Sequence, residues 1–294
     1  MNKFKALKEI ITSAEISFLM EGHNAISARI AQESGFRAIW ASGLTISASM
    51  GVSDRNEVSW TQVLEVVECM ADSIDVPVLM DGDTGFGNFN NVSRLVKKMC
   101  QKGIAGVCLE DKLFPKLNSF LGEEQTLIDM QEFCGKIKAA KDSQTDDDFI
   151  VVARTEALVS GKDMTEALRR SEAYHKAGAD AILIHSKQQT GDEVIQFARE
   201  WARRSPVCVV PTTYYKTPVE EYERNGITGV IWANHSMRAS VTALKKITQR
   251  IMMERSVMSI EDEISSVKDI FQLTNEYQVQ EAEGIYLGLR EKAI

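Results

Sequence analysis

The sequence lacks the features of a secreted, membrane-bound or nucleic-acid-binding protein. Its five cysteines are odd in number and contain no Cys-x-x-Cys pair, so we expect buried, reduced thiols and no disulfides. No apolar run approaches the roughly 20 residues that cross a bilayer, and residues 1–15 have the pattern of an amphipathic helix and not of a signal peptide. The net charge of −8 argues against nucleic acid or an anionic membrane as a partner. We therefore predict a soluble, cytoplasmic protein that binds neither.

Nothing in the sequence divides the chain into separate domains. It contains no linker or low-complexity tract, and α/β barrels reach a length of 294 residues as one domain. A 44% apolar fraction in a chain of this length can form a large core without a structural metal. We expect a single domain over residues 1–294.

Short apolar runs recur along the chain, and most are separated by segments with helical periodicity or helix-end signals. The runs are residues 16–20, 38–41, 76–80, 106–109, 149–153, 181–184, 207–210 and 229–233. Near-continuous apolar runs fit strands that are buried on both faces of a parallel sheet. Eight repeats of strand and helix predict a (β/α)8 barrel of the TIM type. A doubly wound open sheet is the alternative, but no Gly-x-Gly-x-x-Gly follows the first run.

Helical patterns occupy several of the intervening segments and the C-terminal part of the chain. The predicted helices are residues 60–70, 91–102, 165–176, 218–225, about 242–254 and about 265–288. We therefore expect the barrel to cover about residues 14–253 and a helical extension to cover about 260–294. The extension lies beyond the eighth unit, so it either caps the barrel or packs on a neighbouring subunit.

Polar side chains follow nearly every predicted strand. They are Glu21, His23, Ser42, Gly43, Asp81, Asp83, Glu110, Asp111, Arg154, Glu156, His185, Ser186, Thr212, Asn234 and His235. Catalytic groups of barrel enzymes lie at the carboxyl ends of the strands. The sequence thus predicts one active site at that end of the barrel.

Three carboxylates are candidates for a metal site. Asp81 and Asp83 should point to the same side of an extended chain, and Glu110 follows the next predicted strand. Oxygen ligands without cysteine or paired histidines favour Mg2+ or Mn2+ over zinc. The alternative for Asp-x-Asp alone is an Asx-turn with solvated carboxylates. With Glu110 nearby we favour the metal site.

The remaining candidates each have a functional and a structural interpretation. Arg154 is suited to clamp carboxylate or phosphoryl oxygens, but it is also suited to a buried ion pair. His185 is either a site residue or a core histidine, and His23 is equally open. The backbone amides around Ser42 and Gly43 are predicted to hold an anion, although Ser-Gly is also a common loop dipeptide.

Taken together, these residues resemble the isocitrate lyase and phosphoenolpyruvate mutase superfamily, and within it the phosphoenolpyruvate mutases. The resemblance covers almost the whole chain. Its most specific segment, residues 110–119, reads EDKLFPKLNS and matches the mutase pattern E-D-K-x-F-P-K-x-N-S. Supporting segments are residues 39–44, 51–57, 81–91, 185–187 and 231–235. Residue 82 is glycine where the mutases usually have alanine.

The resemblance implies a role for each matching residue. Asp81 would ligate Mg2+, with Asp83 and Glu110 holding its waters, and Mn2+ is an expected substitute. Asp54 would lie beside the substrate, either as a nucleophile or as a positioning group. The remaining implied site residues are Trp40, Ser42, Gly43 and Leu44 at the substrate carboxylate, Arg154 and His185 at the phosphoryl group or the carboxylate, and Lys116, Asn118 and Ser119 on a loop that closes over the substrate.

The implied reaction interconverts phosphoenolpyruvate and phosphonopyruvate, the P–C bond-forming step of phosphonate biosynthesis. Residues 112–116 read KLFPK, without the cysteine of the lyase motif K-K-C-G-H, which argues against lyase activity. Phosphonopyruvate hydrolase is the nearest alternative. Asn118 favours the mutase, because relatives with hydrolase activity replace it. Residues 120–126 form a shorter segment than in the mutases and lack their H-D-G-R-like run.

The resemblance also implies partners. We expect a homodimer or homotetramer with exchanged C-terminal helices. A separate phosphonopyruvate decarboxylase is expected to consume the product, because the equilibrium favours phosphoenolpyruvate. A ligand-binding scaffold without activity is the non-enzyme alternative, and Mg2+-dependent turnover would distinguish the two.

Overall fold

The structure of the chain is a computed structural model that describes residues 2–118 and 126–287. It contains two compact units, residues 1–235 and residues 236–294.

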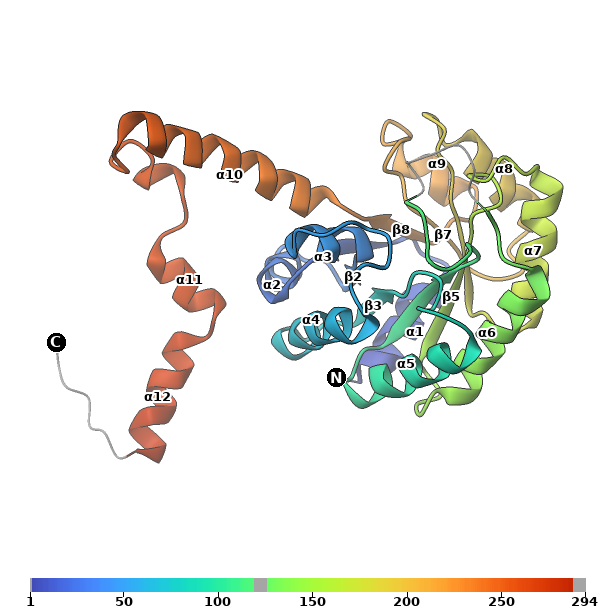
Figure 1. Ribbon diagram of the computed structural model, residues 1–294, viewed down its shortest axis with the longest axis horizontal. Helices are drawn as coiled ribbons and strands as arrows, with labels where there is room; N and C mark the ends of the chain where they lie inside the picture. The colour runs from blue at the N-terminus through green and yellow to red at the C-terminus, as the bar shows by residue number, and fades with distance from the viewer. Residues whose placement is uncertain (1, 119–125, 288–294) are drawn as a thin grey trace. The chain divides into compact units, whose positions relative to one another are not determined.

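The first unit is a closed barrel of eight parallel strands (Figure 1). The strands are β1 (Ser17–Gly22), β2 (Ala38–Ala41), β3 (Val78–Asp81), β4 (Gly106–Glu110), β5 (Ile150–Thr155), β6 (Ala181–Ile184), β7 (Val207–Val209) and β8 (Gly229–Trp232). Each strand pairs with the next, and β8 closes the barrel on β1 with Ser17 opposite Gly229. The predicted barrel is confirmed, and each predicted run matches a strand to within two residues at either end.

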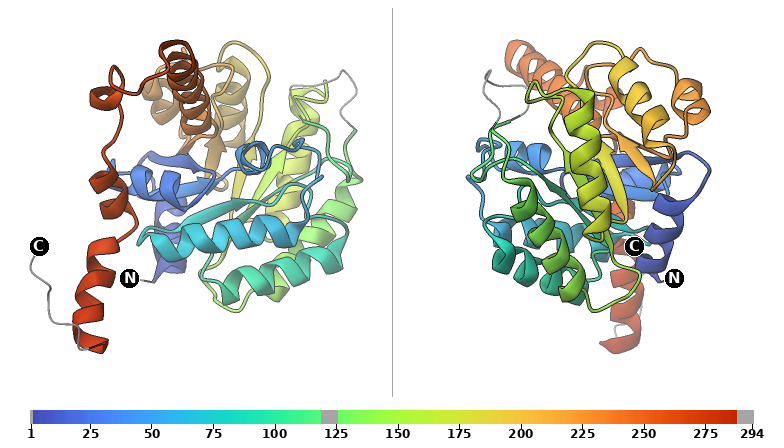
Figure 2. Two further views of the ribbon diagram at one scale, coloured as in Figure 1. Left: turned by 60° about the vertical axis from the view of Figure 1, so that its left-hand side comes forward. Right: turned by 90° about the vertical axis from the view of Figure 1, so that its right-hand side faces the viewer.

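Helices surround the strands (Figure 2). Those of the first unit are α1 (Lys3–Thr12), α2 (Ala25–Glu33), α3 (Gly43–Ser49), α4 (Trp60–Ser73), α5 (Phe89–Gln101), α6 (Met130–Ser143), α7 (Met164–Lys176), α8 (Asp192–Trp201) and α9 (Val219–Arg224). The predicted helices at 60–70, 91–102, 165–176 and 218–225 correspond to α4, α5, α7 and α9. Side-chain caps fix several helix starts; for example, the hydroxyl of Ser59 accepts from the amide of Gln62 at the start of α4.

Two apolar layers hold the barrel together. The larger lies between the strands and the surrounding helices, and the smaller fills the barrel interior. Helix α1 contributes Leu7, Ile10 and Ile11 to the interior layer. A Cβ atom at Gly106 of β4 would lie 2.8 Å from the Leu7 side chain, so this glycine permits the close approach of α1. Helix α1 therefore fills the amino-terminal end of the barrel and leaves the opposite end for chemistry.

The second unit consists of α10 (His235–Glu254, of which His235 belongs to the first unit), the 3-10 helix η1 (Glu261–Glu263), α11 (Val267–Leu273) and α12 (Glu276–Tyr286). Glu263 ties η1 to α10 through Lys246 at 2.9 Å and Arg250 at 2.6 Å. The helical stretch predicted over about 265–288 contains two helices, α11 and α12. Asn275 adopts a left-handed conformation with φ 58° and separates α11 from α12. The predicted start at 242 was seven residues late, since α10 begins at His235. The predicted domain boundaries themselves stay a prediction.

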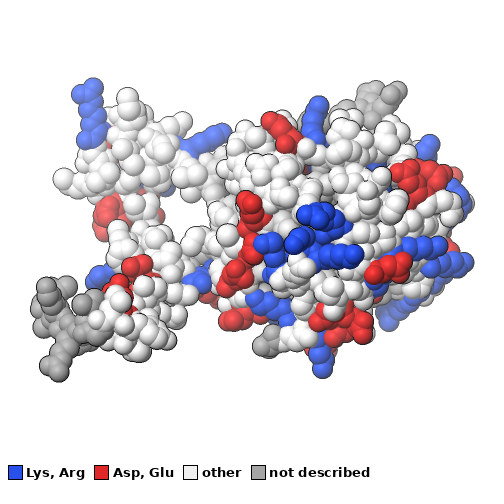
Figure 3. Space-filling view, turned by 60° about the horizontal axis from the view of Figure 1, so that its bottom comes forward, with Lys and Arg blue, Asp and Glu red and all other residues white. Residues whose placement is uncertain are grey.

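On the side of the molecule in Figure 3, acidic and basic side chains are interspersed over the barrel unit. Among the described residues, no helix combines the length and the apolar character that a membrane crossing requires.

Candidate active site

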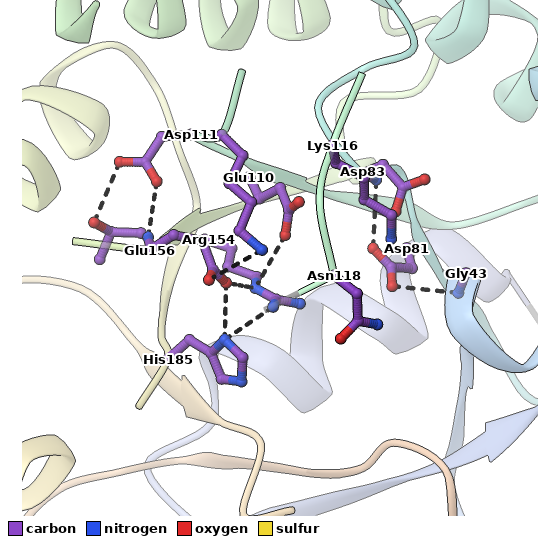
Figure 4. A network of polar contacts seen from close by, with 12 residues as sticks. Gly43, Asp81, Asp83, Glu110, Asp111, Lys116, Asn118, Arg154, Glu156 and His185 are labelled. Atoms are coloured by element: carbon purple, nitrogen blue, oxygen red, sulfur yellow. Dashed lines mark hydrogen bonds and ion pairs between the residues drawn. The ribbon is translucent and has the colours of Figure 1, made fainter. Parts of the chain in front are cut away.

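The carboxyl ends of the strands surround one pocket, as the sequence predicted. Its lining combines charged, polar and apolar side chains from strand ends and from the loops after them. The lining residues are Trp40, Ser42, Leu44, Asp54, Asp81, Glu110, Lys112, Lys116, Leu117, Asn118, Arg154, His185, Val210, Thr212, Ala233 and Asn234. Asp81 and Glu110 are the last residues of β3 and β4, and Arg154 is the penultimate residue of β5. Parallel strands thus bring together groups that are far apart in the sequence (Figure 4).

Most of the predicted site residues line this pocket, and two more lie directly behind it. Gly43 and Asp83 contact the lining residue Asp81. Ser119 lies outside the described residues, as do residues 120–125 of the altered loop. Glu21 and His23 pair with each other at 2.7 Å and are not among the lining residues.

Asp81 and Asp83 meet beside Gly43, although the reason given from the sequence was wrong. The chain does not stay extended after Asp81: it turns, and Asp83 has a left-handed φ of 48°. The amide of Gly43 donates to Asp81 Oδ2 at 3.2 Å. A Cβ atom at Gly43 would lie 3.1 Å from Asp83 Oδ1 and 3.3 Å from Asp81 Oδ2. The absence of a side chain at Gly43 is therefore what lets both carboxylates approach the start of α3.

Lys116 joins two aspartates from different loops. Its Nζ lies 2.7 Å from Asp54 Oδ1 and 2.5 Å from Asp83 Oδ1. Burial by itself lowers the pKa of Lys116, but Asp83 and Asp54 raise it well above the ordinary value, so the ammonium group carries its charge. Burial raises the pKa of Asp83 to about 7, against the opposing effect of Lys116. Asn118 donates from Nδ2 to the second oxygen of Asp54 at 2.7 Å. Asp54 is thus held by both loop side chains.

On the other side of the pocket, Glu156 lies at the centre of a cationic cluster. Its Oε1 contacts Arg154 Nε and lies 2.8 Å from His185 Nδ1, and its Oε2 lies 3.5 Å from Lys112 Nζ. Arg154 also lies 3.3 Å from Glu110 Oε2. Burial alone would raise the pKa of Glu156, but Arg154, His185 and Lys112 hold it well below the ordinary value. Arg154 therefore belongs to a buried ion-pair network and lines the pocket as well.

Burial shifts the pKa of His185 in the opposite direction. Burial lowers the pKa of this imidazole from its usual value, and the neighbouring Glu156 offsets only part of the effect. Its Nδ1 lies 2.8 Å from Glu156 Oε1 and 2.9 Å from an Arg154 nitrogen, so the imidazole is part of the same buried network. The side chain is only 2% exposed and is among the residues that line the pocket, and its role in the site stays a prediction.

Three residues of this arrangement were not among the predicted site residues. Lys112 and Glu156 were visible as strand-end or motif residues, yet only the barrel geometry brings both against Arg154. Asn56 gave no signal of its own. It donates to Asp83 Oδ2 at 2.7 Å and accepts from the amide of Lys116 at 2.8 Å.

A buried network behind the pocket supports Glu156. Asp111 accepts from the Glu156 amide at 2.7 Å through Oδ1. Its other oxygen accepts from the Tyr174 hydroxyl at 2.6 Å and from Arg170 at 3.2 Å. Arg170 also reaches the carbonyl of Ile128 at 3.2 Å, where the chain returns from the loop that carries Lys116. Helix α7 therefore fixes both the Glu156 backbone and the end of that loop.

The oxygen ligands for a metal are present but separated. Within residues 2–118 and 126–287, no three histidine, cysteine or acidic side chains form a ready group around a metal position. Lys116 and Arg154 neutralise Asp83 and Glu110 instead. Glu110 Oε1 is buried and has no hydrogen-bond partner among the described residues. Such an oxygen is a suitable ligand for a hard cation, because a buried carboxylate oxygen without a partner is costly.

Known proteins resemble this chain in sequence as well as in fold. The family model described as phosphoenolpyruvate phosphomutase matches residues 6–252. The phosphoenolpyruvate phosphomutase of Tetrahymena pyriformis is 52% identical over 286 residues, which cover 97% of this chain and 95% of that protein. The crystal structure of phosphoenolpyruvate phosphomutase from Streptomyces platensis subsp. rosaceus has a TM-score of 0.95 at 42% identity, and the match covers 97% of this chain and 99% of that one.

A crystal structure of phosphonopyruvate hydrolase in complex with oxalate and Mg2+ is also similar. Its TM-score is 0.92 at 37% identity, and the match covers 98% of this chain and 100% of that one. The match to the family model, the identity to the mutase sequences and the closed barrel agree with one another. The chain belongs to the phosphoenolpyruvate phosphomutase family.

Proposed function

We propose that the chain interconverts phosphoenolpyruvate and phosphonopyruvate. The observation that carries this proposal is that Lys116 and Asn118, which line the pocket, both contact the carboxylate of Asp54. It places a carboxylate, a charged ammonium group and an amide together on one side. Arg154 and His185 face the pocket from the other side. A cationic side chain on each side of the pocket, Lys116 on one and Arg154 on the other, suits a substrate that carries both a carboxylate and a phosphoryl group.

We propose Mg2+ as the cofactor, with Mn2+ as a substitute. Asp81, Asp83 and Glu110 would hold it directly or through water, and all their donor atoms are oxygens. The buried Glu110 Oε1, which lacks a partner among the described residues, supports this assignment. The similar phosphonopyruvate hydrolase structure with oxalate and Mg2+ supports it too. When bound, the ion supplies stabilisation of the negative charge on the enolate oxygen.

In the proposed reaction, the bond between phosphorus and the enol oxygen breaks and a bond from phosphorus to C3 forms. Arg154 and Lys116 carry positive charge and would stabilise the phosphoryl oxygens during a loose transfer. Ser42, Gly43 and Leu44 at the start of α3, together with Trp40, would orient the substrate carboxylate. In this structure the Gly43 amide donates to Asp81, so Ser42 and Leu44 are the members of this group that line the pocket.

Asp54 has two possible roles. As a nucleophile, its carboxylate oxygen would accept the phosphoryl group from the enol oxygen, and C3 of the enolate would then attack phosphorus and release Asp54. As a positioning group, it would only orient the phosphoryl group between Lys116 and Asn118. Asp54→Ala should abolish turnover in either case. Trapping a phosphorylated Asp54 would support the nucleophile, and a variant with appreciable activity would exclude both roles.

The second candidate function is phosphonopyruvate hydrolysis, because the match to the similar hydrolase structure covers 98% of this chain at 37% identity. The contact of Asn118 with Asp54 favours the mutase, since an amide against Asp54 Oδ2 leaves less space there for an attacking water molecule. Phosphorus NMR of the protein with phosphonopyruvate and Mg2+ tests the two functions. Phosphoenolpyruvate as the product establishes the mutase. Inorganic phosphate with pyruvate, and no phosphoenolpyruvate, establishes the hydrolase, and binding without turnover would point to a scaffold.

We also propose that the chain forms a homodimer or homotetramer through its C-terminal helices, a helical extension to a single barrel domain. Helix α10 buries none of its side chains, and α11 and α12 bury none either. Large apolar side chains are exposed along them, among them Leu244, Met252, Met258, Val267, Val279 and Ile285. Such exposed apolar surface usually marks an interface. Light scattering of the full chain tests this proposal, and a monomer at micromolar concentration would contradict it.

A phosphonopyruvate decarboxylase is the proposed pathway partner. The equilibrium should favour phosphoenolpyruvate, so net P–C bond formation needs a following reaction that removes phosphonopyruvate. Adding such a decarboxylase to the purified protein should increase the consumption of phosphoenolpyruvate. Equal consumption with and without it would contradict the coupling.

A further inference from the structure

The side chain of Asn56 connects the carboxylate Asp83 to the loop that carries Lys116. Its Nδ2 donates to Asp83 Oδ2 at 2.7 Å, and its Oδ1 accepts from the Lys116 amide at 2.8 Å. Asn56, Asp83 and Lys116 therefore all contact one another, because Lys116 Nζ lies 2.5 Å from the other oxygen of Asp83. Both oxygens of Asp83 are therefore engaged by residues outside its own loop. One amide side chain holds the backbone of a residue 60 positions away in the sequence.

The loop that contains Asn56 contacts residues 116–118, the Lys116 segment, at more than one point. Asp54, two residues earlier, accepts from Lys116 and from Asn118. The loop itself is held in shape where the Ser53 amide donates to Glu57 at 2.9 Å. In the described part of that segment, Asp54 contacts the side chains of Lys116 and Asn118, whereas Asn56 contacts the backbone of Lys116. A backbone contact fixes the position of the segment whatever rotamer the Lys116 side chain adopts.

The backbone of Asn56 is in the left-handed region, with φ 57°. Asparagine tolerates this region better than most residues, but glycine adopts it without a steric cost. Glycine could not make either hydrogen bond. Aspartate could accept from the Lys116 amide, but it could not donate to Asp83 and would place a second negative charge against it. An amide is the side chain that satisfies both partners at this position.

We propose that Asn56 is a positioning residue that sets the distance between Lys116 and Asp83. This inference rests on the proposed function, because it assigns Asn56 to the same site. Asn56 orients a carboxylate that we expect to hold waters of the metal ion, and it places the ammonium group that we expect to meet the phosphoryl oxygens. Groups that orient ligands in this way typically contribute about 10- to 100-fold to metal affinity or activity.

Two variants separate the contribution of the Asn56 side-chain hydrogen bonds from that of its backbone conformation. Asn56→Gly keeps the left-handed conformation and removes both hydrogen bonds, and Asn56→Asp keeps the acceptor alone. Asn275→Gly is the matched control, because Asn275 has a similar φ of 58° and its side chain makes no cap hydrogen bond. Each variant is compared with the parent by calorimetric titration with Mg2+ alone, by kcat and KM for phosphonopyruvate, and by thermal unfolding.

We expect Asn56→Gly to lower kcat or Mg2+ affinity by about 10- to 100-fold, with a smaller change in KM. Asn56→Asp should lose at least as much, and the Asn275→Gly control should stay within about twofold of the parent. If the glycine variant does not fold, the aspartate variant decides. Mg2+ affinity and kcat both within twofold of the parent would overturn the role of Asn56 and leave the proposed function intact. A parent without mutase activity whose Asn56 variants still lose Mg2+ affinity would overturn the function and leave the role of Asn56 intact.

Discussion

The ammonium group of Lys136 lies 2.9 Å from the carbonyl oxygen of Thr84. Lys136 belongs to α6 and is only 1% exposed, and burial lowers its pKa. Thr84 follows Asp83 in the turn after β3, and it is fully buried. A long side chain from the ring of helices therefore supports the turn that carries Asp83. Since buried lysines are rare without a partner, this contact indicates a structural requirement of the turn.

Replacing this lysine should destabilise the protein. Lys136→Met keeps most of the apolar stem but leaves the Thr84 carbonyl without its donor, which costs about 1–3 kcal/mol. Urea denaturation measures the free energy of unfolding. The exposed Lys138 on the same helix provides the control, and Lys138→Met should change this free energy by less than about 0.5 kcal/mol. Equal effects of the two substitutions would contradict a specific role for the Thr84 contact.

The residues packed around Gly82 in this chain would have to shift to accommodate a side chain. A Cβ atom there would lie 2.5 Å from Val107 Cγ2 and 3.1 Å from the Cys108 carbonyl oxygen. Gly82→Ala should therefore reduce the free energy of unfolding by about 1–3 kcal/mol through overpacking. Val107→Ala makes room, so the double variant should lose less than the sum of the single variants. Strict additivity in a double-mutant cycle would show that the alanine is accommodated in another way.

Asn118 should control the fate of the phosphoryl group. Asn118→Ala removes the hydrogen bond from Nδ2 to Asp54 Oδ2 and opens space for water beside that carboxylate. We expect kcat for phosphoenolpyruvate formation to fall by about 10- to 100-fold, equivalent to roughly 1.4–2.7 kcal/mol. The share of phosphonopyruvate converted to phosphate and pyruvate should increase. Phosphorus NMR follows both products, and Asn90→Ala, at an exposed residue of α5, is the control. An unchanged product ratio would exclude this role for Asn118.

Glu156 should make the stability of the protein sensitive to acid. Its pKa is well below 4.5 in the folded state, because Arg154, His185 and Lys112 outweigh the effect of burial. Its contribution to stability is therefore present above the unfolded pKa and is lost as the pH falls through the folded pKa. Glu156→Gln should cost about 3–5 kcal/mol at neutral pH. This cost should shrink as the pH falls below about 4.5.

Unfolding by urea at a series of pH values measures this dependence. The exposed Glu220 of α9 provides the control, and Glu220→Gln should have little effect at any pH. A constant difference between the parent and Glu156→Gln over the whole series would show that the ion pairs of Glu156 do not stabilise the fold.

The sequence by itself determined the barrel and most of the site. Near-continuous apolar runs can be buried only between two covering layers, so eight of them in alternation with helices specify a closed parallel sheet. Polar residues that end such runs must meet at one end of the barrel, which is why Asp81, Glu110 and Arg154 could be assigned from their positions alone. The Lys116 and Asn118 loop was found through its motif and not through periodicity.

Only the tertiary structure decided which of these groups touch one another. Periodicity indicates which strand end a residue follows, but it does not indicate how the chain turns afterwards. For that reason the left-handed turn at Asp83, the bridge made by Asn56 and the support from Lys136 were invisible in the sequence. Ion pairing also depends on distances across the barrel mouth. The charge state of Glu156 therefore follows from neighbours that the sequence places 2, 29 and 44 residues away.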